Sequence, residues 1–290
     1  MASVEAFCIK SGVGLEDVDG ANGLFESLRV EVTFTGETGR RQREQVTIPR
    51  IGAGASRDVY GLELDGCPLV VKCEDPRVDR QMHRGQNERE RDIDRAFANC
   101  PAFPARVPRV VWSGRCQVGG PLDVLVVERV PHVFMQHLND LQRPPWRWEQ
   151  ALFCVKAALR CCDMCCKALG EGLLCFDLHA ENIGLCQEAV ENTTLRDDVL
   201  PSVEELGVVF VDTGKFQLLK PEERGAFVKE LPKEACDHFS LPLAVVADQM
   251  ARSDLLQNRL LAEVLVDCLS HLHTVAELKA YGLRELARGL

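Results

Sequence analysis

The sequence lacks any apolar run of about 18 to 20 residues, the length that a helix needs to cross a bilayer. Its first residues, MASVEAFCIKSG, contain no basic stretch followed by an apolar one, so we expect no secretory signal and a cytoplasmic location. Positive charge is also scarce, because 34 Lys and Arg against 44 Asp and Glu give a net charge of −10. Nucleic-acid phosphates and anionic membranes would repel such a chain, so neither is an expected partner.

Cysteine, in contrast, is abundant, with 14 residues that are not spaced like a secreted disulfide framework. Four of them form a C-C-x-x-C-C motif at 161–166, whereas a structural zinc site usually takes its ligands from two separated pairs. One buried helical stripe is the favoured interpretation, and it comprises Leu152, Val155, Leu159, Cys162, Cys166 and Leu169. We therefore expect reduced thiols in a core, with a metal site as the less favoured alternative.

The predicted secondary structure changes from mainly strands to mainly helices near the middle of the chain. Alternating or apolar segments predict strands at 28–34, 45–51, 59–64, 68–72, 107–113 and 124–130, with one helix at 86–99. The second half predicts helices at 148–169, 221–231, 241–252, 255–273 and 275–288, with short strands at 172–176 and 207–212. This order predicts an α+β arrangement in two lobes, residues 1–130 and 131–290.

A glycine-rich element, I-G-A-G-A-S-R-D-V-Y at 51–60, connects two of the predicted strands. Gly52 and Gly54 would let backbone N–H groups approach phosphates with no Cβ in the way. The same G-x-G spacing marks ordinary hairpin turns, so both interpretations stay open. The element is neither a Walker loop, which needs G-K-[ST], nor a Rossmann turn, which would open a helix.

Lys72 ends the apolar strand L-V-V-K, where a buried ammonium needs a negative partner. The alternative is a lysine that faces outward at a strand end. In the helix that follows, Glu90 shares its face with the apolar residues Ile93 and Phe97, whereas Glu88 points away. We therefore predict an ion pair between Lys72 and Glu90.

Two further motifs place acidic residues after apolar strands: C-F-D-L-H-A-E-N-I-G at 175–184 and V-V-F-V-D-T-G at 208–214. Asp177 followed by Asn182, and then by Asp212, is a combination that rarely arises by chance. The side-chain oxygens of Asn182 and Asp212 suit Mg²⁺, which takes few protein ligands together with phosphates and water. His179 is either a phosphate contact or a structural histidine bonded to the loop backbone.

These elements, in this order, resemble the signature set of the protein-kinase-like superfamily. The resemblance implies a two-lobed fold, with an antiparallel β N-lobe that carries one main helix and a mostly helical C-lobe. It implies that Gly52, Gly54 and Val59 line a nucleotide site. It also implies that Lys72 contacts the α- and β-phosphates of ATP and that Glu90 orients this lysine.

For the reaction, the resemblance implies that Asp177 accepts the proton of an acceptor hydroxyl and that Asn182 and Asp212 bind Mg²⁺. The adenine of ATP would lie near the connection at 127–130. ATP and a hydroxyl acceptor, on a small molecule or a protein, are therefore the expected partners. The alternative is a pseudokinase that binds nucleotide, or acts as a scaffold, without transfer.

The sequence also departs from the protein-kinase pattern. Arg57 replaces the third loop glycine, Cys175-Phe176 replaces the usual H-R, and D-F-G is D-T-G. The D-L-H-x-x-N form resembles the aminoglycoside and choline phosphotransferases. Arg57 and the missing H-R favour the pseudokinase alternative, whereas the retained polar positions favour an enzyme.

Two further expectations concern regulation and the loop regions. Phe176 leaves no arginine to bind a phosphorylated activation loop, and no A-P-E motif is present, so we expect no regulation by loop phosphorylation. The acidic, turn-rich segment 186–206 is predicted to be an exposed insertion between the two metal ligands.

Overall fold

The computed structural model describes residues 3–13, 25–36, 38–53, 57–74, 85–98, 107–118, 120–130, 133–175, 179–187, 206–220, 222–223 and 231–271. It shows a mixed α/β chain with an antiparallel sheet and several helices, which separates into two compact units. Unit 1 comprises Met1–Ala96 and Pro108–Arg129, and unit 2 comprises Phe97–Val107 and Val130–Leu290. The lobe assignment 1–130 and 131–290 stays a prediction.

Unit 1 contains one antiparallel sheet and the helix α1 (Gln86–Ala98). The strands run in the spatial order β1 (Ser3–Val13), β2 (Ser27–Thr35), β3 (Arg41–Ala53), β4 (Arg57–Leu64), β5 (Cys67–Glu74), β7 (Pro121–Glu128) and β6 (Val110–Gln117). The six strands predicted in this half and its helix are confirmed, most of them with slightly wider bounds. β1 was not predicted.

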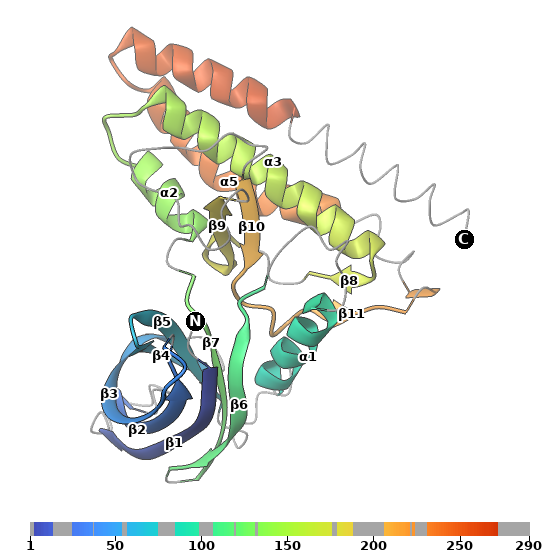
Figure 1. The fold of residues 1–290 in the computed structure, drawn as a ribbon. Coiled ribbons are helices and arrows are strands. Elements are labelled where there is room, and N and C mark those ends of the chain that lie inside the picture. The colour runs from blue at the N-terminus through green and yellow to red at the C-terminus, as the bar shows by residue number, and fades with distance from the viewer. Residues whose placement is uncertain are drawn as a thin grey trace. The chain divides into compact units, whose positions relative to one another are not determined.

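The sheet curls so that its first and last strands come into contact (Figure 1). The Phe7 and Trp112 ring centroids lie 5.4 Å apart, and the Cys116 thiol donates to the Phe7 carbonyl at 3.9 Å. Alternate side chains fill the enclosed space, because successive residues of a strand point to opposite faces. The resulting core includes Phe7, Ile9, Leu28, Val30, Val32, Phe34, Tyr60, Leu62, Leu69, Val71, Cys73, Leu122, Val124 and Val126.

Unit 2 is mainly helical. Its elements are α2 (Phe134–Leu141), α3 (Trp148–Gly170), β8 (Leu173–Leu174), η1 (Ala180–Asn182), β9 (Ile183–Gln187), β10 (Leu206–Phe210), β11 (Gln217–Leu218), α5 (Leu231–Ala251) and helical residues 256–271. β9 pairs with β10 and β11 with β8, both antiparallel. The long helix α3 contacts α2, α5, β8 and β10 (Figure 1).

The predicted helices at 148–169, 241–252 and 255–273 are present, although α5 begins already at Leu231. The strand predicted at 172–176 is shorter, and that at 207–212 corresponds to β10. Most of the predicted helix 221–231, all of 275–288 and residues 188–205 of the predicted insertion lie outside the described residues. Helix α2 was not predicted.

Three of the α3 thiols of the C-C-x-x-C-C motif lie in the core. Cys161, Cys162 and Cys165 are fully buried, as the packing interpretation requires, whereas the side chain of Cys166 lies outside the described residues. The predicted phase of the stripe was partly wrong, because Leu152 and Leu159 are only half-buried. The helix is covered on several sides, so its small residues face the core more often than its leucines.

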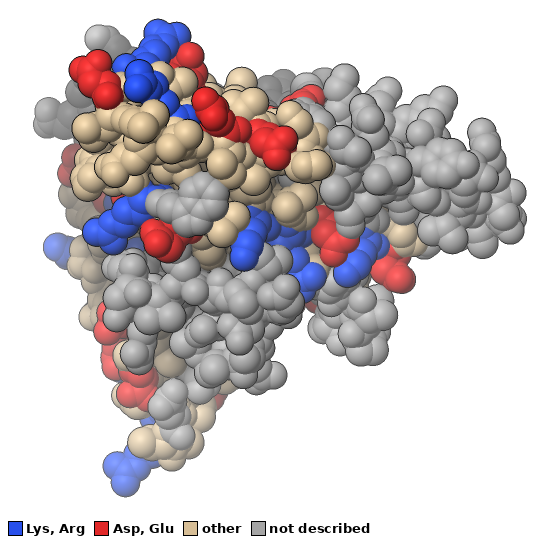
Figure 2. Space-filling model, turned by 90° about the horizontal axis from the view of Figure 1, so that it is seen from above, with Lys and Arg blue, Asp and Glu red and all other residues tan. Residues whose placement is uncertain are grey.

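On the face of the molecule shown in Figure 2, the coloured residues carry acidic and basic side chains interspersed among uncharged ones. No large area of one sign is present among the described residues on this face. Among the helices that the structure describes, none is long and apolar enough to cross a membrane.

We predict that the α3 thiols resist alkylation while the protein is folded. Burial raises the pKa of Cys161 well above its usual value, and at Cys165 a hydrogen bond with Cys175, followed by burial, does the same. Since the thiolate is the reactive form, little of it exists near neutral pH. Peptide mapping after iodoacetamide treatment should find the exposed Cys8 modified first and the α3 cysteines only after denaturation.

Labelling of the α3 peptides at the rate of Cys8 in native protein would contradict this packing. Stoichiometric zinc that leaves only on unfolding would restore the metal interpretation.

Candidate functional site

Charged side chains line one face of β4 and β5. Arg57 and Val59 of β4 lie directly opposite Glu74 and Lys72 of β5, respectively. Because side chains alternate along a strand, these four face away from the hydrophobic core that receives Tyr60. This part of the sheet therefore presents two cations and one carboxylate toward the side from which α1 contributes its own polar residues.

Lys72 and Glu90 form a buried ion pair. The Lys72 Nζ lies 2.5 Å from the Glu90 Oε1, and the two side chains are only 6% and 3% exposed. The predicted pair is confirmed, and the alternative of an outward-facing lysine is wrong. Glu88, two residues before Glu90, is 72% exposed, as the predicted phase of the helix requires.

Arg57 also contacts Glu90. Its Nη1 lies 2.6 Å from the Glu90 Oε2 and donates to the Asn87 Oδ1 at 3.2 Å, and its side chain is 4% exposed. From the sequence, Arg57 was interpreted only as a departure from a third glycine. Arg57 precedes Val59 by two residues, and side chains two apart on a strand point to the same face of the sheet. The sequence could therefore have placed Arg57 on the face that also carries Lys72.

Asn87 connects α1 to two strands. Its Nδ2 donates to the Lys72 carbonyl at 3.2 Å and to the Asp123 carbonyl at 2.8 Å, while its Oδ1 accepts from Arg57. All three hydrogen bonds are made with the same orientation of the Asn87 side-chain amide. Asn87 was not predicted, although its position three residues before Glu90 places both on one helix face.

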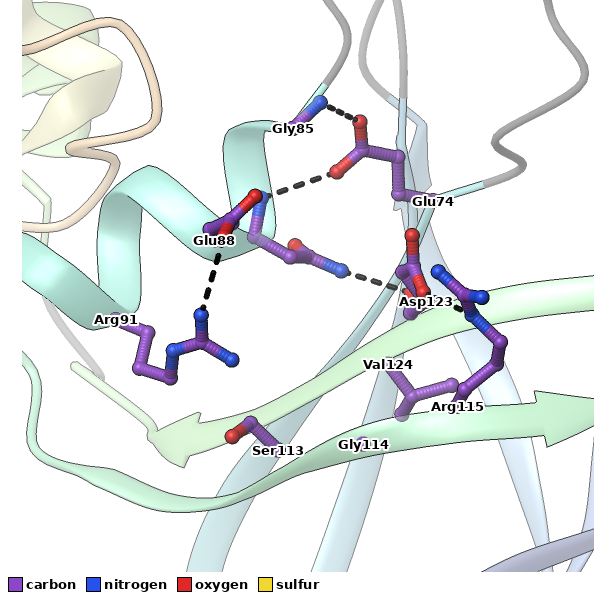
Figure 3. Close-up of a pocket in the computed structure, with 10 residues that line it drawn as sticks. Glu74, Gly85, Glu88, Arg91, Ser113, Gly114, Arg115, Asp123 and Val124 are labelled. Carbon is purple, nitrogen blue, oxygen red and sulfur yellow. Dashed lines mark hydrogen bonds and ion pairs between the residues drawn. The ribbon is translucent and has the colours of Figure 1, made fainter.

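Glu74 closes the N-terminus of α1 (Figure 3). Its Oε1 accepts from the backbone N–H groups of Gly85 at 2.6 Å and Gln86 at 3.3 Å, and its Oε2 accepts from that of Asn87 at 3.0 Å. A carboxylate at this end of a helix satisfies N–H groups that have no partner within the helix and complements the helix dipole. Glu74 was not predicted, although it follows Lys72 by two residues on the same strand.

A cavity of about 350 Å³ adjoins this network between the start of α1 and strands β6 and β7 (Figure 3). Its lining includes the ion pairs Arg91–Glu88, at 3.6 Å, and Arg115–Asp123, at 2.9 Å. The lining thus carries charges in opposite pairs rather than a field of one sign.

The glycine-rich element lies in the connection between β3 and β4. Gly52 pairs with Val59 near the end of β3, and residues 54–56, including Gly54, lie outside the described residues. Among the described residues, a Cβ added at Gly52 would meet only the Val59 Cβ, at an ordinary distance of 3.9 Å. No neighbouring group in this part of the chain therefore excludes a methyl group at position 52.

The second group of predicted residues lies in unit 2, at one end of the β9–β10 ribbon. Ile183 pairs with Phe210, and the Val211 N–H donates to the Asn182 carbonyl at 2.9 Å. Asn182 is therefore opposite the residue that precedes Asp212. Antiparallel pairing brings these two positions together although a long segment separates them in sequence.

Hydrogen bonds orient both side chains. The Asp212 Oδ1 accepts from the Gly214 N–H at 3.0 Å, and the Asn182 Nδ2 lies 3.0 Å from the His179 Nε2. Because an amide nitrogen only donates, the His179 Nε2 accepts. The ring thus bonds the Asn182 side chain, while residues 176–178 of the loop lie outside the described residues, and contacts of His179 with the loop backbone or with phosphate stay predictions. Asp177 lies outside the described residues.

The donor atoms at this end of the ribbon fit Mg²⁺. An amide oxygen of Asn182 and a carboxylate of Asp212 are hard oxygen ligands, which Mg²⁺ prefers. Among the described residues, no three His, Cys, Asp or Glu gather as a metal site. Two protein ligands would hold Mg²⁺ only together with the oxygens of a bound phosphate and water.

Sequence comparison gives no match, since no protein-family model and no curated protein matches the chain. Among solved structures, the chain is similar to WaaP in complex with acyl carrier protein, at 13% identity and a TM-score of 0.38 over 81% of this chain and 88% of that chain. It is also similar to the crystal structure of the BubR1 kinase domain, at 13% identity and a TM-score of 0.44. That likeness covers 72% of this chain and 54% of the other. Both likenesses are distant, so the chain's own residues carry the function proposed below.

We predict that Glu90→Gln lowers the free energy of unfolding by about 3 kcal/mol or more, because it leaves two buried cations without their carboxylate. Glu88→Gln, a matched change on the exposed face of the same helix, should stay within about 0.5 kcal/mol of wild type. Urea unfolding followed by circular dichroism measures both. Similar losses in the two variants would show that the helix phase is wrong.

Proposed function

We propose that the chain is an ATP-dependent phosphotransferase of the protein-kinase-like superfamily, with lobes 1–130 and 131–290, which transfers the γ-phosphate of ATP to a hydroxyl. The observation that carries this proposal is the buried Lys72–Glu90 ion pair between β5 and α1. A buried ammonium is costly and retained where its charge has a use. Here it lies on the strand directly opposite Val59, which belongs to the glycine-rich element.

In this proposal, Lys72 donates to the α- and β-phosphates while Glu90 fixes its direction. Gly52 supports a phosphate nearby, since no neighbouring group among the described residues excludes a side chain at that position. A glycine that the fold does not require is explained if a ligand approaches its backbone closely. Val59, half-buried on the same face as Lys72, would contact the nucleotide base.

Asn182 and Asp212 would hold Mg²⁺, and their oxygen donors fit this ion. Bound Mg²⁺ would neutralise charge on the phosphates. Within the chain, the Gly214 N–H orients the Asp212 carboxylate and His179 orients the Asn182 amide. Each ligand is therefore held by its own neighbour, as metal ligands commonly are.

Asp177 would orient the acceptor hydroxyl and take its proton as the oxygen attacks the γ-phosphorus and ADP leaves. The protein contributes positioning and charge stabilisation rather than covalent chemistry. The acceptor is a hydroxyl on a small molecule or a protein.

Two measurements on the purified full chain test the function. The first is the thermal shift with ATP in the presence and absence of Mg²⁺, which reports binding through mass action. The second is consumption of labelled ATP with a panel of hydroxyl acceptors. Binding with transfer supports the enzyme, and binding without transfer supports the pseudokinase alternative. The absence of both binding and transfer would reject both interpretations.

We predict that Asp177→Asn and Asp212→Asn separate transfer from binding. Asp177→Asn should keep the Mg·ATP shift and lower transfer by roughly 100-fold, the scale of a positioned general base. Asp212→Asn should weaken both, because it removes charge beside the metal. If Asp177→Asn changes neither transfer nor binding, Asp177 is not the base.

We predict that Gly52→Ala keeps the stability of the protein and weakens ATP affinity by about tenfold or more. The new methyl group fits the protein but would enter the space of the phosphates. Gly170→Ala is the matched control, since a Cβ there meets no described neighbour within 4 Å and the residue ends α3 in unit 2. Equal ATP affinities of the two variants would remove Gly52 from the site.

A further inference from the structure

We propose that Arg57 is a positioning residue, which holds Glu90 and α1 in place so that Lys72 can turn toward a phosphate. The first part concerns the protein without ligand and stands on unit 1 alone. The second part, on the phosphate, rests on the proposed function.

The Arg57 side chain bonds both Glu90 and Asn87 of α1, whereas the Lys72 ammonium bonds Glu90 and it is the Lys72 backbone carbonyl that accepts from Asn87. The Arg57 Nη1 lies 2.6 Å from the Glu90 Oε2 and 3.2 Å from the Asn87 Oδ1, and these partners are three residues apart on one helix face. All three side chains are almost fully buried. Hydrogen bonds to charged groups are the stronger ones in proteins, and buried ones are not weakened by competition with water.

The two cations contact different oxygens of Glu90, Lys72 at Oε1 and Arg57 at Oε2. Two cations thus share the charge of one carboxylate. Without Arg57, the whole charge of Glu90 would act on Lys72 at short range in a poorly solvated site, where such attraction is strong. Lys72 would then be held more tightly by Glu90 and be less available to a phosphate.

Several contacts within unit 1 hold α1. Glu74 of β5 closes the start of the helix, Asn87 donates to carbonyls of β5 and β7, and Arg57 of β4 holds Glu90. These contacts keep the Glu90 face of the helix toward Lys72.

The first test uses hydrogen exchange of the nucleotide-free full chain. Arg57→Met should raise the exchange of α1 amides by about tenfold or more, whereas Lys72→Met should raise it less, because Arg57 still holds both points on the helix. Arg57→Lys retains the charge but places it on a shorter side chain without the planar guanidinium, so it should give an intermediate result. Equal exchange in wild type and Arg57→Met, or greater exchange in Lys72→Met, would overturn the proposal.

The second test measures Mg·ATP affinity by thermal shift. Arg57→Met should weaken it by about tenfold, with partial recovery in Arg57→Lys. Arg50→Met is the matched control, because Arg50 pairs at 2.5 Å with a different buried carboxylate, Asp58. It should lower stability but leave affinity unchanged. If Arg57→Met lowers stability alone, its role toward Lys72 is rejected.

The two tests fail independently. If wild type shows no ATP shift, the proposed function fails, while hydrogen exchange still decides whether Arg57 holds α1.

Discussion

A buried carboxylate is the constraint on which the organisation of unit 1 depends. Glu90 is held between Lys72 and Arg57, and an uncompensated charge at its depth would cost several kcal/mol. The charge of Glu90 is compensated only if β4, β5 and α1 pack in one fixed register, because β4 and β5 each supply one of the two cations. The curled sheet provides this register by placing its apolar residues inside and leaving the charged face toward α1. The polar cluster and the hydrophobic core are therefore two sides of the same strands.

The parts of this arrangement that could be predicted depend on local periodicity. Alternation identified most strands of unit 1, and helix phase separated Glu90 from Glu88, so the Lys72–Glu90 pair followed from sequence. The strand β1 and the eight-residue helix α2 were not predicted, because a weakly alternating edge strand and a helix of two turns carry little periodic signal. Tertiary packing, rather than local preference, forms both.

The remainder of the site depends on contacts that no local pattern encodes. Asn87 bonds backbone carbonyls of two strands, and any residue type offers such a carbonyl, so the sequence does not mark its partners. Asn182 and Asp212 were predicted as a pair from motifs, yet it is the β9–β10 pairing that brings them together. A long segment between paired strands is tolerated because the entropy cost of closing a loop rises slowly with its length.

The replacement of a loop glycine by Arg57 has a different meaning in sequence and in structure. As a motif it is a loss, and it favoured a decayed site. In the structure it adds a second cation to Glu90 and a second point of attachment for α1. Arg57 thus bonds two buried residues of α1 from the neighbouring strand β4. The loss of a motif glycine and the gain of a buried contact are therefore one and the same substitution, so the missing glycine is not by itself a sign of decay.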